Sequence, residues 1–122
     1  MTTEPGKKFD AGKAPVSQGL FDYFPRALLA VAEISQFGFE KYKTWGGWRS
    51  VPDGENRYEN ACGRHTLWRR IEGIFDRESR LRHRAHRAWN ALATLELELE
   101  AAENALLESN QALDIAAEEL KP

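Results

Sequence analysis

Residues 80–120 read RLRHRAHRAWNALATLELELEAAENALLESNQALDIAAEEL, and this stretch decides the fold. Apolar or small residues recur along it in alternating steps of four and three, a heptad repeat that is typical of a coiled coil or a helical bundle. At a rise of about 1.5 Å per residue, an unbroken helix here is about 60 Å long. A compact domain of this size has a radius of gyration of only about 14 Å. We therefore expect an oligomer that covers the helix, the alternative being a break near residues 108–110 that makes a hairpin. The repeat comprises Leu81, Ala85, Ala88, Leu92, Leu95, Leu99, Ala102, Leu106, Ser109, Leu113, Ala116 and Leu120.

The first part of the chain predicts an arm followed by a helix. Residues 1–19 are rich in glycine, proline and lysine, as extended or looped segments are. Pro25 suits the first turn of a helix. Apolar residues from Arg26 to Tyr42 then follow a helical period. These patterns predict one helix after the arm.

The middle of the chain predicts a loop and a second helix. Glycine and proline pairs in residues 43–55 are loop signals. The second helix should run from about Asn56 to Glu72 and end at the following glycine. Asp76 or Ser79 can cap the third helix, because both side chains accept hydrogen bonds from free backbone N–H groups. The sequence therefore predicts an all-α fold.

The composition is that of one folded domain. The chain has 122 residues, of which 42% are hydrophobic and 11% aromatic, which argues against disorder. No apolar run approaches the roughly 20 residues that span a bilayer, and residues 1–20 lack the hydrophobic segment of a secretory signal. We therefore expect a cytoplasmic protein without a membrane partner. Its single cysteine, Cys62, excludes an intramolecular disulfide and a cysteine-based metal cage.

The net charge of -2 hides an asymmetry along the chain. Residues 1–90 contain 16 basic and 11 acidic side chains, which gives +5. Residues 91–122 contain one basic and eight acidic side chains, which gives -7. The basic part should attract an anion, whereas the acidic part should repel nucleic acid. We therefore expect a small phosphorylated ligand and no direct contact with nucleic acid.

Residues 64–90 hold the side chains best suited to chemistry. The stretch contains all three histidines and eight arginines, with acidic residues among them. Arginine binds phosphate bidentately, and imidazole and carboxylate groups ligate metal ions. His83, His86 and Asn90 fall at i, i+3 and i+7 and so share one helical face. The stretch therefore predicts a site that holds a polyanion beside a metal ion.

The first predicted helix offers oxygen ligands. Glu33 and Glu40 are seven residues apart and share a face with Gln36. Carboxylates are the ligands that Mg²⁺ and Mn²⁺ prefer. Glu33 stands among apolar residues, so an inward ligand and a solvated charge are both open for it. Glu40 is followed by a lysine and is predicted to be a solvated charge.

The end of the first helix and the start of the second offer groups for a nucleotide. Tyr42 and Trp45 can stack a base while Lys41 meets a phosphate, although the aromatic pair could equally cap the core. Arg64 can bind phosphate or pair with a nearby carboxylate. The chain has neither a GxxxxGK[ST] nor a GxGxxG motif, which excludes P-loop and Rossmann chemistry.

Several motifs follow one another in the order of a known family. Residues 8–15 match K-x-D-x-G-K-x-P, and residues 37–42 match F-G-x-x-K-Y, followed by a tryptophan. Arg64-His65 comes next, and residues 76–90 match D-x-E-S-x-x-x-H-x-x-H-x-x-x-N. Over residues 7–97 the chain therefore resembles the phage-associated, MazZ-like dATP/dGTP diphosphohydrolases, which are related to the all-α MazG nucleotide pyrophosphohydrolases.

The resemblance implies both a fold and an activity. It implies a MazG-like helical bundle that cleaves a purine deoxynucleoside triphosphate, dGTP or dATP, to the monophosphate and pyrophosphate with Mg²⁺ or Mn²⁺. The catalytic core would span residues 20–99, after an arm of residues 1–19. From the heptad repeat, in turn, we expect residues 100–122 to be an acidic helical extension that packs a homo-oligomer, a dimer or, as in many MazG-like folds, a tetramer. A phage-encoded member would act in the cytoplasm of an infected bacterium.

We hypothesise roles for individual residues of this chain in such a reaction. The expected catalytic residues are Glu33, Asp76, His65 and His83. The expected metal ligands are Glu33, Asp76, Glu78, His86 and Asn90. The expected substrate-binding residues are Lys13, Lys41, Tyr42, Trp45 and Arg64.

Two other functions fit the same sequence. One is a non-catalytic helical scaffold, whose basic stretch binds an acidic partner surface or a nucleotide effector. The other is a regulator that binds deoxynucleoside triphosphates without cleaving them. An assay for pyrophosphate release separates both from the hydrolase.

Overall fold

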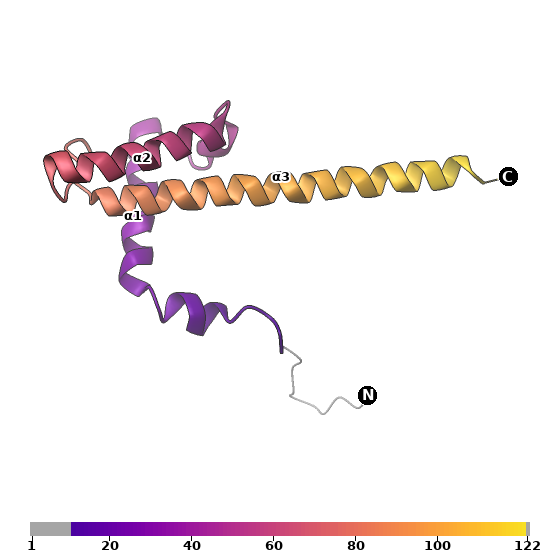
Figure 1. Cartoon of the computed structure of the whole chain (residues 1–122), viewed down its shortest axis with the longest axis horizontal. Coiled ribbons are helices and arrows are strands. Elements are labelled where there is room, and N and C mark those ends of the chain that lie inside the picture. Colours follow the sequence, from indigo (N-terminus) through magenta and orange to yellow (C-terminus); the bar gives the residue numbers. More distant parts are fainter. Residues whose placement is uncertain (1–10, 122) are drawn as a thin grey trace.

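The computed structural model describes residues 11–121 and has an all-α fold, which confirms the predicted fold class (Figure 1). Among these residues, the backbone pairs in β fashion only at an isolated bridge between Phe75 and Arg82. The start of the first family motif, residues 8–10, and most of the predicted arm lie outside the described residues. Every helix within residues 11–121 is too short or too polar to be a membrane span. The elements are η1 (Ser17–Phe21, a π-helical turn), α1 (Pro25–Tyr42), η2 (Gly47–Ser50, a 3₁₀ turn), α2 (Gly54–Glu72) and α3 (His83–Glu119).

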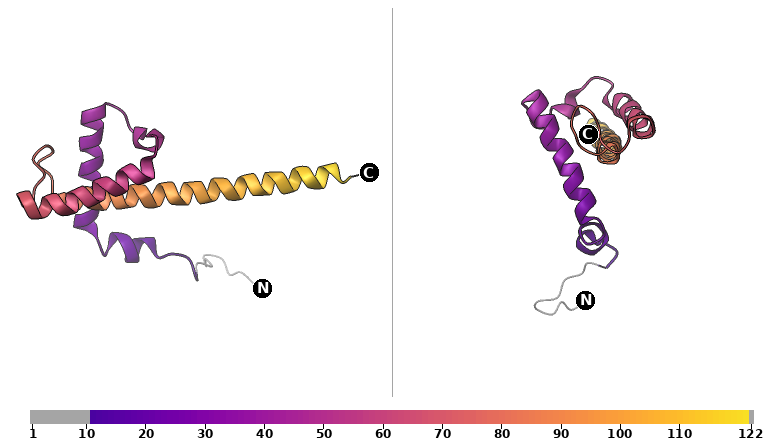
Figure 2. Two further views of the ribbon diagram at one scale, coloured as in Figure 1. Left: turned by 45° about the horizontal axis from the view of Figure 1, so that its top comes forward. Right: turned by 90° about the vertical axis from the view of Figure 1, so that its left-hand side faces the viewer.

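Helices α2 and α3 form an antiparallel hairpin, and α1 crosses it (Figures 1 and 2). Helix α2 begins two residues earlier than expected and ends at Glu72, as predicted. Gly73 follows with φ 98°, a conformation that side-chain-bearing residues rarely adopt. The chain then turns back through residues 73–82, and the His83 N–H donates to the Ile74 carbonyl at 2.9 Å. This loop places the start of α3 beside the end of α2.

Helix α1 has the bounds expected for it and packs on α3. The indole N–H of Trp89 donates to the Ser35 hydroxyl at 3.0 Å. Trp89 also meets Trp48 and Tyr58 edge-on, with ring centroids 5.7 and 5.6 Å apart. Ile34, the residue before Ser35, is buried. The Trp89–Ser35 hydrogen bond and the burial of Ile34 therefore hold α1 against α3, whereas the aromatic contacts of Trp89 tie α3 to η2 and α2.

Helix α3 is continuous for 37 residues, so the alternative of a break near residues 108–110 is wrong. Its start was predicted three residues too early, and neither Asp76 nor Ser79 caps it. The residue at the N-cap position is Arg82, which makes no side-chain cap. Asp76 and Ser79 form hydrogen bonds within the preceding turn instead, where the Ser79 N–H donates to Asp76 Oδ2 at 2.8 Å. Their local bonding keeps residues 80–82 out of the helix.

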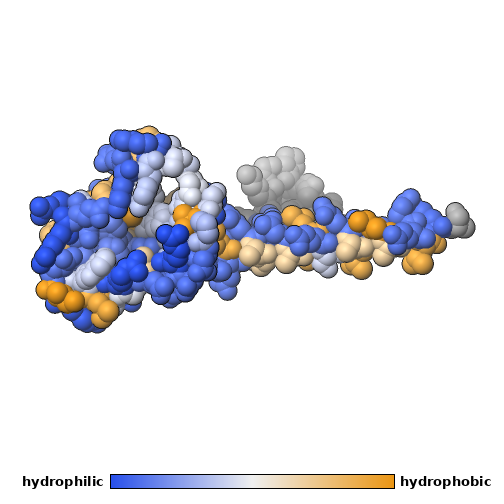
Figure 3. All heavy atoms as spheres, turned by 90° about the horizontal axis from the view of Figure 1, so that it is seen from above, coloured by the Kyte–Doolittle hydropathy of each residue, from blue (hydrophilic) through white to orange (hydrophobic). Residues whose placement is uncertain are grey.

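Most of the predicted heptad stripe does not face α2. The buried stripe of α3 consists of His83, His86, Asn90 and Ala93, which repeat in steps of three and four, and the heptad residue Ala85 is buried beside it. The heptad leucines lie on the opposite side of the helix, where Leu99 is 56% and Leu106 62% exposed. Figure 3 shows hydrophobic side chains along the projecting part of α3, beside hydrophilic ones. We call the exposed members Leu92, Leu95, Leu99, Leu106 and Leu113 the leucine seam.

We predict that α1 docks largely through Ile34. Changing Ile34, which is 6% exposed, to alanine should lower the free energy of unfolding by about 2–5 kcal/mol, because a cavity replaces buried methyl groups. The matched control is Leu29→Ala on the same helix, where the side chain is 68% exposed and the loss should stay within about 0.5 kcal/mol. Urea unfolding followed by circular dichroism measures both. Equal losses in the two variants would contradict this packing.

Candidate functional site

His83, the first residue of α3, is the most buried group of the site. Its side chain has no exposed surface. Its Nε2 lies 2.7 Å from Glu72 Oε1 at the end of α2, at an angle too oblique for a full hydrogen bond. Its Nδ1 lies 2.9 Å from His65 Nδ1 on α2. The carboxylate of Glu72 favours a proton on Nε2, which leaves the lone pair of His83 Nδ1 facing His65.

The turn between α2 and α3 supplies the carboxylate of the site. Asp76 is held by the Ser79 N–H and by its own N–H, which donates to the Leu81 carbonyl at 2.8 Å. Ser79 Oγ accepts the Leu81 N–H at 3.1 Å and shares a hydrogen bond of 2.6 Å with His86 Nε2. The His86 ring stacks on His65, with centroids 4.4 Å apart and planes 3° from parallel. One short turn therefore positions Asp76 and His86 against the histidine of α2.

His65, Asp76 and His83 present donor atoms that all lie within 4.8 Å of one another. Two imidazoles and a carboxylate are a donor set that divalent transition metals accept. The 2.9 Å between the two Nδ1 atoms is close to the roughly 3 Å between adjacent ligands of an octahedral ion bound at about 2.1 Å. Glu72 behind His83 matches the carboxylate that commonly orients a metal-bound histidine. The residues present therefore fit a divalent metal ion.

Burial keeps the imidazoles of His65 and His86 neutral near pH 7. Burial and the neighbouring His86 lower the pKa of His65 from 6.5 to about 4. Burial also lowers the pKa of His86, although Asp76 opposes the shift. For Asp76, burial would raise the pKa, but hydrogen bonds from the Ser79 backbone and side chain outweigh it, so the pKa is lowered. An ionised carboxylate thus stands beside neutral rings, the protonation states that metal ligation needs.

Of the three donors that lie close together, only Asp76 was predicted as a metal ligand, since His65 and His83 were expected as catalytic residues; the remaining predicted ligands have different surroundings. His86 Nε2 is 3.8 Å from Asp76 Oδ2, beside the group of three. Asn90 is buried, but its side-chain amide donates to the His86 carbonyl at 2.8 Å, along its own helix. Glu78 is exposed and paired with Lys41 at 2.5 Å. The structure thus brings His86 close to the cluster and places Asn90 and Glu78 outside it.

His65, Asp76, His83 and His86 form what we call the histidine cluster. One face of α1 points toward it. The Phe37 ring meets the His86 ring edge-on at 6.0 Å, and Lys41 reaches Glu78 on the turn. Glu33 is four residues before Phe37 and projects on the same side of α1. Its side chain is exposed, and it is not among the three donors that lie close together.

The predicted substrate-binding residues are exposed. The hydrogen bond to Glu78 raises the pKa of Lys41 and keeps it charged. Trp45 stacks on Phe39 with centroids 4.6 Å apart, and Tyr42 lies beside the Lys41 ammonium, which is 5.4 Å from its ring centroid. Arg64 extends over Trp68 and does not pair with a carboxylate within the described residues. Lys13 is exposed ahead of η1.

The sequence profile of the family described as dATP/dGTP diphosphohydrolase, N-terminal, matches residues 3–117. The chain belongs to this family. The match confirms the resemblance that the motifs suggested, and it covers the site as well as most of α3. No curated protein and no solved structure matches the chain. The family description names the N-terminal part of a diphosphohydrolase.

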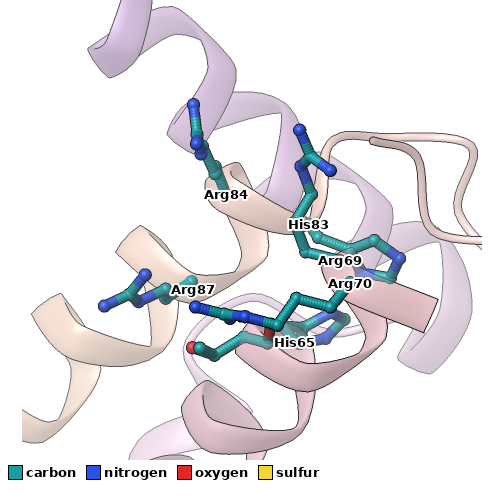
Figure 4. Close-up of a pocket in the computed structure, with 7 residues that line it drawn as sticks. His65, Arg69, Arg70, His83, Arg84 and Arg87 are labelled. Carbon is teal, nitrogen blue, oxygen red and sulfur yellow. The ribbon is translucent and has the colours of Figure 1, made fainter. Parts of the chain in front are cut away.

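The sequence analysis did not assign several groups at the site. Glu72 follows His65 by seven residues, two helical turns, and this spacing could have placed both on one face of α2. Arg69, Arg70, Arg84 and Arg87 line a cavity of about 260 Å³ beside His65 and His83 (Figure 4). The density of arginines in residues 64–90 signalled a polyanion site, but the sequence alone did not say which arginines face it.

We predict that the metal-free protein loses stability as the pH falls below about 6.5. In the unfolded chain His65 and His86 bind protons near pH 6.5, whereas in the folded protein His65 does so only near pH 4. The unfolded state therefore holds more protons in this window, and stability is full above it and declines through it. In a chelating buffer the melting temperature should be lower at pH 5 than at pH 7.5. The difference should shrink in His65→Gln, and a flat profile in the native chain would contradict the burial of these rings.

Proposed function

We propose that this protein is a metal-dependent diphosphohydrolase that converts a purine deoxynucleoside triphosphate, dGTP or dATP, to the monophosphate and pyrophosphate. The observation that carries the proposal is the group formed by His65, Asp76 and His83 in a chain whose family is described as a dATP/dGTP diphosphohydrolase. The cavity lined by arginines beside the same histidines adds a place for phosphates.

His65, Asp76 and His83 would hold the metal ion. Mn²⁺ suits this donor set better than Mg²⁺, which prefers oxygen ligands and binds imidazole poorly. When bound, a divalent ion lowers the pKa of water and neutralises charge on the phosphates. Glu72 keeps the His83 ring oriented through the 2.7 Å contact at Nε2. Glu33 is proposed as a further carboxylate, since it shares the α1 face that meets His86.

The α1 end of the site would hold the nucleoside. Trp45, already stacked on Phe39, leaves most of its surface exposed and offers a platform for a purine, with Tyr42 beside it. Lys41 stays charged beside Glu78 and can turn to a phosphate, as can Arg64. Lys13, at the start of the described chain, is proposed as a further phosphate contact.

The reaction is attack of water on the α-phosphorus. The water oxygen forms the new bond to phosphorus, the bond from phosphorus to the α–β bridging oxygen breaks, and pyrophosphate leaves. The protons of the water pass to the leaving pyrophosphate and to solvent. The Asp76 oxygen and the His65 ring nitrogen that do not hold the ion would orient the water and the phosphate oxygens, whereas His83 would act through the ion. Phosphoryl transfer depends mainly on such positioning and on charge stabilisation.

We predict that the site variants lose turnover while they stay folded. Asp76→Asn and His83→Gln should each lower kcat by about 100-fold or more, since a bound ion supplies several kcal/mol of transition-state stabilisation. Glu33→Gln should also lower kcat strongly if its carboxylate belongs to the site. The matched control is Glu103→Gln on the projecting part of α3, where the carboxylate is exposed and kcat should not change.

The assay uses the purified full chain. Each of the eight common nucleoside triphosphates is incubated with Mg²⁺, Mn²⁺, Co²⁺ or Zn²⁺, and pyrophosphate is measured. Circular dichroism checks the helical content of each variant, and calorimetry measures Mn²⁺ binding. If the native chain consumes no triphosphate with any metal, the hydrolase is wrong and the scaffold or the nucleotide-binding regulator takes its place.

We propose further that a second copy of this chain covers the leucine seam. The seam continues the heptad repeat past the end of α2, and Leu99, Leu106 and Leu113 are all more than half exposed. A parallel pair would set two segments with a charge of -7 side by side. An antiparallel pair brings the acidic part of one copy toward the basic part of the other. We therefore propose an antiparallel dimer, which can pair again to a tetramer.

We predict that charges in the seam separate the subunits. The double variant Leu99→Lys and Leu106→Lys should move the mass measured by light scattering from the dimer or tetramer to the monomer, because buried ammonium groups in a seam are strongly unfavourable. The control is Ala101→Lys and Asn104→Lys, which adds the same charge of +2 at exposed positions on the opposite side of the helix. A native chain that is monomeric at micromolar concentration would contradict the proposal.

A further inference from the structure

A cavity of about 260 Å³ opens between α2 and α3 on the flank of the histidine cluster. Arg69 and Arg70 reach it from α2, and Arg84 and Arg87 reach it from α3 (Figure 4). His65 and His83 form its inner wall, and no carboxylate lines it. Four guanidinium groups around one small hollow repel one another, so the hollow is suited to an anion.

Two of the other arginines in the same stretch have partners, unlike most of those at the cavity. Arg77 is paired with Glu72 at 2.9 Å, and Arg82 lies over the Phe75 ring at 5.1 Å. In contrast, Arg69, Arg84 and Arg87 make no ion pair or side-chain hydrogen bond within residues 11–121. Their positive charge is therefore not neutralised within the described chain.

A hydrogen bond to the backbone orients the Arg70 side chain. Its Nη1 donates to the Thr66 carbonyl at 2.8 Å, one turn earlier on α2. This bond fixes the side chain along the helix while the remaining N–H groups stay free to donate. Such an anchored guanidinium loses little side-chain entropy when it binds a ligand.

The size and charge of the cavity define its ligand. About 260 Å³ is below the 300–1,000 Å³ of typical sites for drug-sized molecules, so a whole nucleotide does not fit inside. Guanidinium groups bind phosphate oxygens bidentately. Four of them exceed what one phosphate can neutralise, but they match the three to four negative charges of two linked phosphates.

We propose that this arginine pocket is a binding site for condensed phosphate, with pyrophosphate as its smallest ligand, and that it binds this anion without a metal ion. Arginine stays charged at every pH at which the protein is folded, so the site does not depend on the state of the histidines. The link to catalysis rests on the proposed function: pyrophosphate released at the histidine cluster would lie in this pocket, next to His65 and His83.

The test is calorimetry of the full chain with inorganic pyrophosphate, tripolyphosphate and orthophosphate in a chelating buffer. Pyrophosphate and tripolyphosphate should bind, and orthophosphate should bind at least 10-fold more weakly. The double variant Arg84→Gln and Arg87→Gln should lose about 30-fold or more in affinity for pyrophosphate, because charge-assisted hydrogen bonds are lost at both positions. The single variant Arg87→Lys, which keeps the charge but not the bidentate geometry, should fall between.

The control removes the same charge elsewhere. Arg26→Gln and Arg57→Gln lower the net charge by two at the starts of α1 and α2, where neither side chain lines the pocket. Pyrophosphate affinity should change less than threefold in this variant. Equal losses of pyrophosphate affinity in the two double variants, or no binding of pyrophosphate to the native chain at low salt, would contradict this binding site.

Measurements of hydrolysis and of product inhibition distinguish failure of the pocket proposal from failure of the hydrolase proposal. If the protein binds pyrophosphate at these arginines but cleaves no triphosphate, the pocket stands and the hydrolase is wrong. If hydrolysis continues in Arg84→Gln and Arg87→Gln with an unchanged KM and unchanged inhibition by pyrophosphate, the pocket is wrong and the hydrolase stands.

Discussion

The site depends on the contacts that the buried imidazole of His83 makes with α2. It is the first residue of α3, yet its two ring nitrogens face Glu72 and His65, both on α2. A polar ring without exposed surface is costly unless its nitrogens have partners. The hairpin must therefore close so that the start of α3 lies beside both the end of α2 and a point two turns before that end. The loop of residues 73–82 makes this possible through its own hydrogen bonds.

The site separates charged from neutral groups in space. Imidazoles and one carboxylate lie at the centre, where burial lowers the pKa of His65 to about 4. Guanidinium groups, which cannot lose their charge, lie around the rim. A metal ion needs unprotonated ligands, whereas an anion needs fixed positive charge. Placing both kinds of group within one helical hairpin allows a metal and a phosphate chain to be neighbours without a proton competing for the ligands.

Much of the fold could be predicted from the sequence because it depends on local signals. Pro25 starts α1, and Gly73, which adopts a positive φ, follows the end of α2; both residues have conformational preferences that need no partner. The start of α3 was placed too early, since a capping residue looks the same in sequence as one that closes a turn. Asp76 and Ser79 do the latter.

The site was predictable in its composition but not in its pairing. His65, Asp76 and His83 were all expected at the site, and they lie together. Glu72 and the pocket arginines were missed because their roles arise from how α2 packs against α3. Helical period alone gives the face of a residue, not the residue across from it. The same limit applies to α3, where two stripes of equal period run side by side and only one of them meets α2.

The buried stripe and the leucine seam both lie on α3, so this helix connects the site with the proposed subunit contact. In the described residues, the apolar side chains that are buried are Ile34, Ala85 and Ala93, which is a very small core for a folded unit. The polar contacts of the histidine cluster add specificity but little net stability, because each replaces a contact with water. Burying the leucine seam would add apolar area along the same helix that begins with His83. Since a rigid helix transmits its position along its whole length, a partner on the seam would also steady the turn at its start. Assembly and site geometry would then be coupled through one element, α3, so the stability of the site would depend on protein concentration.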